Sequence, residues 1–326
     1  MISSTTELEQ RSLSGKQPGH YQPHALHAHG RTYLESNCYS DIIIELLHAC
    51  GYEPLAAFGH LLRMDFEGDQ WTFFKPPPED LELLFGIDIH EMQPYRPLPL
   101  QIAEQLEHGR GMIVELDSWY LPDTASTSYR SEHVKTSVGA DAIDVENQTL
   151  RYFHSAGLFE LNGEDYRGVF RISGAFTEDV LPPYTELVRF DAGPALRGGE
   201  LRGAALGLLR RHLAQRPRTN PFERFGAHLA RELPALLEQG LEAYHAYAFA
   251  TVRMAGSAFE IAASHLEWLL GAQATPAASS MGEIVDGCKA LSFRLARRRP
   301  FDAEPLIVSL AHSWARAVED LVESVG

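Results

Sequence analysis

Residues 35–52 read ESNCYSDIIIELLHACGY and decide the fold expected for the first half of the chain. Apolar side chains recur in this stretch at helical spacing, at Ile42, Ile43, Leu46, Leu47 and Cys50. Gly51 follows as a typical C-terminal stop. The pattern predicts an amphipathic helix over 39–50 with one buried face, to which Cys50 belongs.

Cys38 falls at the start of this helix, directly after Asn37, a residue type that caps helix N-termini. The free N–H groups and the macrodipole at a helix N-terminus favour negative charge, and a thiol becomes a strong nucleophile only as the thiolate. Two interpretations stay open at this point. Cys38 is a catalytic nucleophile, or it is a small structural residue.

A nucleophilic thiol needs a base and a group that orients the base. His133 opens the predicted strand HVKTSV, and His154 ends the predicted partner strand LRYFHS. In a hairpin of these two strands, His154 would lie where an orienting acceptor is needed. Asp117 follows the apolar stretch MIVEL and is the alternative orienter, or else an anchor for a substrate ammonium group.

The rest of the chain predicts three regions. Residues 1–30 are polar and form an N-terminal arm, 31–172 combine short helices with antiparallel strands, and 173–326 carry long Ala- and Leu-rich helical periodicity. We therefore expect an α+β domain followed by an all-helical C-terminal domain.

Composition narrows the classes of function. The 326 residues carry a formal net charge of −16, which argues against nucleic acid as a partner. No stretch is apolar enough for a membrane span, the N-terminus does not resemble a signal peptide, and three cysteines without framework spacing favour reduced thiols. We expect a cytoplasmic protein, and no metal site, since His24, His27 and His29 lack a recognisable ligand spacing.

Several motifs resemble known families. NCYSDIIIELL (37–47), GMIVELDSWYLPD (111–123) and YRSEHVKTSVGADAID (129–144) are similar to the N-terminal domain of the butirosin biosynthesis protein H family. The chain also resembles the bacterial DUF1839 family, whose members carry NCY, DFEGDQWTFFK, YLPDT, H-x-K-T and YFH. All five occur here.

The resemblance implies a papain-like cysteine protease or acyltransferase fold, with Cys38, His133 and His154 as catalytic residues. It implies transfer of an acyl or aminoacyl group, through a Cys38 acyl-enzyme, to an amine or hydroxyl acceptor in small-molecule biosynthesis. The donor would be a thioester on the phosphopantetheine of an acyl or aminoacyl carrier protein, so the enzyme would need no cofactor of its own. The matched motifs add two substrate-binding candidates, Tyr120 and Lys135.

Two positions depart from the papain-like pattern. Thr32 stands where such enzymes carry an oxyanion-hole Gln, so Asn37 or Thr32 becomes the candidate donor. The third catalytic position holds His154 in place of Asn or Asp.

Two other functions stay open: a cysteine hydrolase (amidase, peptidase or thioesterase) with the same site, and a non-catalytic binding protein with a structural Cys38. The basic cluster Arg294–Arg299 is either a solvated helix end or a docking patch for the carrier protein.

Overall fold

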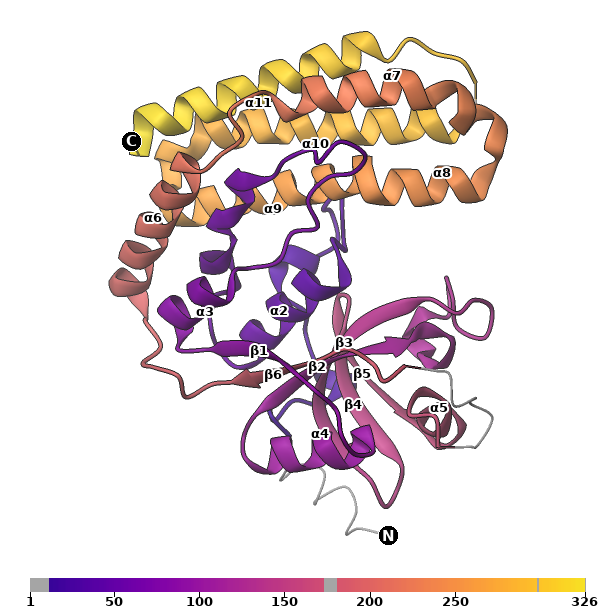
Figure 1. Cartoon of the computed structure of the whole chain (residues 1–326). Helices are drawn as coiled ribbons and strands as arrows, with labels where there is room; N and C mark the ends of the chain where they lie inside the picture. Colours follow the sequence, from indigo (N-terminus) through magenta and orange to yellow (C-terminus); the bar gives the residue numbers. More distant parts are fainter. Residues whose placement is uncertain (1–11, 173–180, 298, 326) are drawn as a thin grey trace. The chain divides into compact units, whose positions relative to one another are not determined.

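The computed structural model describes residues 12–172, 181–297 and 299–325, and the chain divides into two compact units (Figure 1). The first unit takes the chain up to Ala25, Cys38–Pro54 and Pro78–Leu196. The second unit takes Leu26–Asn37, Leu55–Pro77 and the chain from Arg197 onward. The units are therefore interleaved along the sequence.

A six-stranded antiparallel sheet forms the first unit, with the strand order β1-β6-β2-β3-β4-β5 (Figure 1). The strands are β1 (Asp88–Met92), β2 (Gly111–Asp117), β3 (Lys135–Asp144), β4 (Thr149–His154), β5 (Gly157–Asn162) and β6 (Thr185–Arg189). The unit also contains the helices α2 (Cys38–Ala49), α3 (Pro78–Phe85), α4 (Leu98–Glu107) and α5 (Gly163–Val169). Together with the C-terminal helices, this confirms an α+β chain with a helical C-terminal region.

Helices cover both faces of the central strands. On one face α2 packs against β3 and β4, so closely that a Cβ atom at Gly139 would lie 2.9 Å from a methyl group of Ile42. On the other face α4 packs against β2 and β3, and its Ile102 belongs to a buried cluster with Val114 and Val138. Since side chains alternate along a strand, odd-numbered residues at the start of β3 face α2 and even-numbered ones face α4.

The helix predicted over 39–50 is α2, and the strands predicted around His133 and His154 are β3 and β4. Two strands were not predicted, β1 and β6, which are short and carry polar residues. β6 pairs with both β1 and β2, so the sheet extends past residue 172, where we had placed the end of the α+β region. Their pairing is long-range, which local periodicity does not reveal.

The described part of the N-terminal arm, from residue 12, is bonded to the sheet. Backbone N–H of Leu13 donates to the carbonyl of Asp141 at 2.8 Å, and Ser12 Oγ and Ser14 N–H donate to its carboxylate. Asp141 is fully buried. The arm thus satisfies a buried carboxylate that the sheet alone would leave short of donors.

The second unit consists mainly of α-helices. They are α6 (Gly198–Ala214), α7 (Pro221–Gln239), α8 (Leu241–Ala248), α9 (Met254–Leu270), α10 (Thr275–Ala296) and α11 (Glu304–Val325). Trp71, only 1% exposed, anchors the 55–77 segment among them, with its ring 4.7 Å from that of Phe222 and 6.3 Å from that of Phe259.

A buried histidine makes the stability of this unit depend on pH. Burial lowers the pKa of His265 to about 4, although its Nδ1 donates to the carbonyl of Leu55 at 2.7 Å. Its Nε2 has no hydrogen-bond partner among the described residues, and nearby His212 further disfavours a second proton. The folded protein therefore stabilises the neutral form of the His265 ring relative to the protonated form.

We expect the stability contributed by neutral His265 to be complete above pH 6.5 and to be lost as the pH falls from 6.5 to about 4. In that window the unfolded chain binds the proton first, so the free energy of unfolding falls by about 1.4 kcal/mol per pH unit, roughly 3 kcal/mol in all. The free energy of unfolding is measured with urea for wild type and His265→Gln across this pH range. The difference between the two proteins at each pH gives the contribution of His265. Equal pH slopes for the two proteins would contradict it.

Candidate functional site

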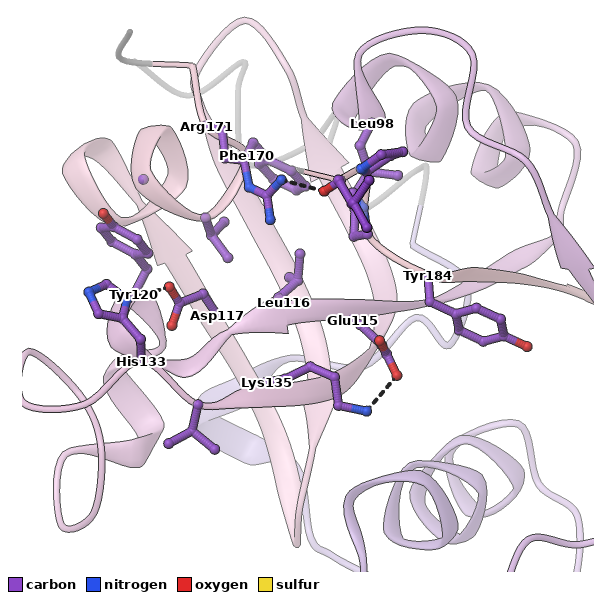
Figure 2. Close-up of a pocket in the computed structure, with 16 residues that line it drawn as sticks. Leu98, Glu115, Leu116, Asp117, Tyr120, His133, Lys135, Phe170, Arg171 and Tyr184 are labelled. Carbon is purple, nitrogen blue, oxygen red and sulfur yellow. Dashed lines mark hydrogen bonds and ion pairs between the residues drawn. The ribbon is translucent and has the colours of Figure 1, made fainter. Parts of the chain in front are cut away.

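A pocket of about 490 Å³ opens in the first unit where β2 ends and β3 begins (Figure 2). Charged and aromatic side chains line one part of it: Glu115, Asp117, Tyr120, His133, Lys135, Arg171 and Tyr184. Apolar side chains line the rest, among them Leu98, Leu116, Val134, Val169, Phe170, Leu181, Pro182 and Pro183. Four of the predicted site residues, Asp117, Tyr120, His133 and Lys135, therefore share one pocket.

His133 and Asp117 form a hydrogen-bonded pair in this pocket. His133 Nδ1 lies 2.7 Å from Asp117 Oδ2, and the other carboxylate oxygen accepts the backbone N–H of Trp119 at 3.0 Å. The imidazole stacks on the Trp119 ring, with centroids 4.5 Å apart and planes 9° from parallel. Two contacts thus fix the orientation of the ring, whose side chain is 65% exposed, and the Trp119 N–H holds the carboxylate that makes one of them.

This geometry selects one tautomer of His133. An ionised carboxylate only accepts hydrogen bonds, so Nδ1 carries the proton and a neutral ring presents the lone pair of Nε2. The arrangement suits general acid–base catalysis, and the bond to Nδ1 places Asp117 where a group that orients His133 is needed.

A second charged pair lies beside the first. Lys135 Nζ donates to Glu115 Oε1 at 2.7 Å (Figure 2). Glu115 precedes Asp117 by two residues on β2, so both carboxylates point to the same face of the sheet. The Tyr120 ring packs against Gly168. A Cβ atom at Gly168 would lie 2.2 Å from this ring, so the position of Tyr120 in the pocket wall requires a glycine there.

Cys38 is the first residue of α2, as predicted, and it is a free, half-buried thiol. Its Sγ lies 3.7 Å from Ser137 Oγ on β3. Ser137 is four residues after His133, about 13 Å along the chain at strand spacing. The His133 ring is turned to Asp117 and Trp119. The hydrogen-bond partner that the structure gives the thiol is thus Ser137, and the partner of the His133 ring is Asp117.

His154 does not orient His133, and our expectation for it requires correction. Its Nδ1 lies 2.5 Å from Asp123 Oδ2, and its Nε2 lies 2.9 Å from Thr136 Oγ1. Thr136 and His154 are even-numbered residues on the α4 face, whereas Cys38 lies on the α2 face. Asp123 also accepts from the buried Tyr152 hydroxyl. His154 thus belongs to a buried polar network inside the core.

Asn37, the predicted oxyanion donor, is buried in the second unit, where its side-chain amide donates to the carbonyl of Phe74 at 3.1 Å. In the basic cluster, Arg294, Arg297 and Arg299 are exposed, and Arg298 lies outside the described residues. Within the described ranges, no group of three or more His, Cys, Asp or Glu side chains could hold a metal ion.

Sequence reasoning missed four residues of these networks, namely Glu115, Trp119, Asp123 and Ser137. Two signals were available. The period of two in β2 puts Glu115 on the same face as Asp117, and Asp123 stands inside the YLPDT motif that was already singled out. Ser137 had no such signal, because its meeting with Cys38 depends on how α2 packs.

The fold and the pocket define an α+β protein with a histidine–carboxylate pair in a partly apolar cavity. Residues 22–190 match the DUF1839 N-terminal domain and residues 198–323 match the DUF1839 C-terminal domain. The chain belongs to the DUF1839 family. No curated protein matches it. Across the described residues, none of the helices combines the length and the apolar character that crossing a membrane requires.

Proposed function

We propose that the protein is an acyltransferase in which His133, oriented by Asp117, acts as the general base. The observation that carries the proposal is the 2.7 Å bond from Nδ1 to Asp117 in a ring that lines a pocket of about 490 Å³. Nε2 takes a proton from an acceptor amine or hydroxyl, which attacks the thioester carbonyl. The C–S bond breaks, and the leaving thiolate takes up the proton from His133.

The donor in this proposal is an acyl or aminoacyl thioester on a carrier protein. It is supported by the resemblance of residues 37–47 and 111–144 to the butirosin biosynthesis protein H family. We place the chain in the papain-like superfamily on the same grounds, together with the packing of α2, which begins at Cys38, against β3 and β4. The carrier protein would dock on the exposed arginines of the 294–299 cluster. A cytoplasmic location stays a prediction.

A covalent route through Cys38 is the second candidate. The position of the thiol at the N-terminus of a 12-residue helix favours it, because that position stabilises a thiolate. The acyl group would pass first from the thioester to Sγ and then to the acceptor. This route needs His133 and the thiol to approach each other, since the hydroxyl of Ser137 is the partner that Sγ meets in the structure.

Product analysis tests the class of reaction. The full-length protein is incubated with aminoacyl-loaded carrier proteins and a panel of amines, and the products are identified by mass spectrometry. An amide or ester product supports transfer, and a free acid alone would make the protein a hydrolase. No loss of thioester beyond the uncatalysed rate would contradict both.

The variant Cys38→Ala decides between the two routes. We expect it to keep turnover within about threefold of wild type, because the thiol contacts Ser137 and not His133. Intact-protein mass spectrometry of wild type should then show no acyl adduct on Cys38. An adduct that Cys38→Ala abolishes, together with loss of turnover, would establish the covalent route. Cys50→Ala, a thiol whose pKa burial raises to about 11, is the matched control.

A further inference from the structure

We propose that Glu115 is the specificity residue of this pocket, and that it binds a primary ammonium group carried on an apolar body. In the structure the ε-ammonium of Lys135 occupies the position that we assign to the ligand ammonium, 2.7 Å from Glu115 Oε1. The inference rests on the proposed function, which makes this pocket the place where the acyl group and the acceptor meet. The new element is the chemical class of one of these two groups, which would carry a primary ammonium.

Lys135 is held loosely enough for exchange. Its side chain is 66% exposed, whereas that of Glu115 is 25% exposed. An exposed lysine on a long side chain gains little from such a pair, because water screens the charge and the chain loses rotamer freedom. A ligand ammonium that reaches Glu115 along with apolar contacts can therefore replace it.

The charge around Glu115 favours a cation. Burial and the carboxylates of Glu186, Glu91 and Glu115 raise the pKa of Tyr184, at the pocket rim, to about 12, with burial the largest cause. Glu115 is thus one of three carboxylates that act on Tyr184, and Tyr184 lines the pocket together with Lys135 and Arg171. Asp117 already accepts hydrogen bonds from His133 and from the backbone N–H of Trp119, one on each carboxylate oxygen.

The apolar walls define the body of the ligand. Apolar side chains line the pocket together with Glu115, among them Leu98, Val134, Val169 and Phe170. Walls of this kind favour an aliphatic or aromatic group over a polar one, at roughly 25 cal/mol per Å² of apolar surface removed from water.

The spacing on β2 links the ammonium to the reaction. Glu115 and Asp117 are two residues apart on one face of the strand, a separation of about 7 Å. The carboxylate that binds the ammonium in this proposal therefore lies about 7 Å along the strand from Asp117, the hydrogen-bond partner of His133. That ammonium belongs either to an aminoacyl donor or to a second amine of the acceptor.

Two small probes isolate the ammonium group. Leucinamide and 4-methylpentanamide have the same apolar chain and amide and differ only in the amine. NMR titration of the full-length protein follows the backbone amides of 115–117 and 133–135. We expect leucinamide to bind at least tenfold more tightly at pH 7, and the difference to shrink as ionic strength rises.

Two variants test the residues. Glu115→Gln keeps the volume and should weaken leucinamide at least tenfold while leaving 4-methylpentanamide unchanged. Lys135→Met removes the competing ammonium, so leucinamide should bind several-fold more tightly. The matched control is Glu104→Gln, which breaks a partly exposed pair between Glu104 on α4 and Arg96, and which should alter the binding of neither probe.

Three results would overturn the inference: equal or absent binding of the two probes to wild type, unchanged leucinamide binding in Glu115→Gln, or weaker leucinamide binding in Lys135→Met. The last would show that Lys135 supports binding of the ligand and does not compete with it. Turnover separates the two proposals, since selective binding without transfer refutes only the acyltransferase. With active enzyme, donors with and without the α-amine distinguish an aminoacyl donor from a diamine acceptor.

Discussion

His133→Ala should lower the rate of acyl transfer by roughly 10²–10⁴-fold, the usual contribution of a positioned general base. The fold should be unaffected, because the ring is 65% exposed and its contacts are to Asp117 and Trp119 at the pocket edge. Steady-state turnover of the full-length enzyme, with urea unfolding alongside, measures both.

The chain offers a matched control for this variant. His90 is an exposed histidine whose Nδ1 lies 3.1 Å from Asp88, outside the pocket, so His90→Ala should keep full turnover. Asp117→Asn should lose nearly as much activity as His133→Ala, and the double variant little more, since the pair acts as a unit. Turnover of His133→Ala within threefold of wild type would remove the general-base proposal.

Asp123→Ala should lower the free energy of unfolding by roughly 3–5 kcal/mol, the cost of breaking a buried polar pair and leaving its donors unsatisfied. The side chains of Asp123 and His154 are 3% and 6% exposed, and Tyr152 is fully buried. Removing the carboxylate takes the acceptor from both of them. Urea unfolding at pH 7 gives the value.

Asp88→Ala is the control, since Asp88 also pairs with a histidine but at a partly exposed position, where the effect should stay below about 1 kcal/mol. His154→Ala should likewise lower the free energy of unfolding and leave turnover largely unchanged. If either Asp123→Ala or His154→Ala reduced turnover strongly without changing the unfolding curve, the network would belong to the reaction and not to the core.

The spacing of apolar residues along the sequence predicted the helix and strands whose formation depends mainly on neighbouring residues. The apolar spacing in 39–50 gave α2 to within one residue, and the alternation in 133–154 gave β3 and β4. β6 escaped prediction because its neighbours, β1 and β2, lie more than sixty residues earlier in the chain. The pairing of His133 with Asp117 was foreseen as one of two alternatives, since both residues stand at adjoining ends of neighbouring strands.

The expected triad illustrates what residue order leaves open. Cys38, His133 and His154 occur in the order of a papain-like site, but order does not fix the face of the sheet on which each side chain lies. One residue of register separates Thr136, bonded to His154, from Ser137, which meets Cys38. Because of this one-residue difference, His154 and Cys38 lie on opposite faces of the same strands.

The interleaving of the two units constrains how the chain is made. Trp71 leaves the ribosome more than a hundred residues before Phe222, Phe225 and Phe259, the rings among which it is buried. Until the last of these is synthesised, a large apolar surface in the 55–77 segment has no native cover. The boundary between the two family models, at 190–198, is thus a division of sequence and not of folding. A gene split at that boundary would separate Trp71 from its core.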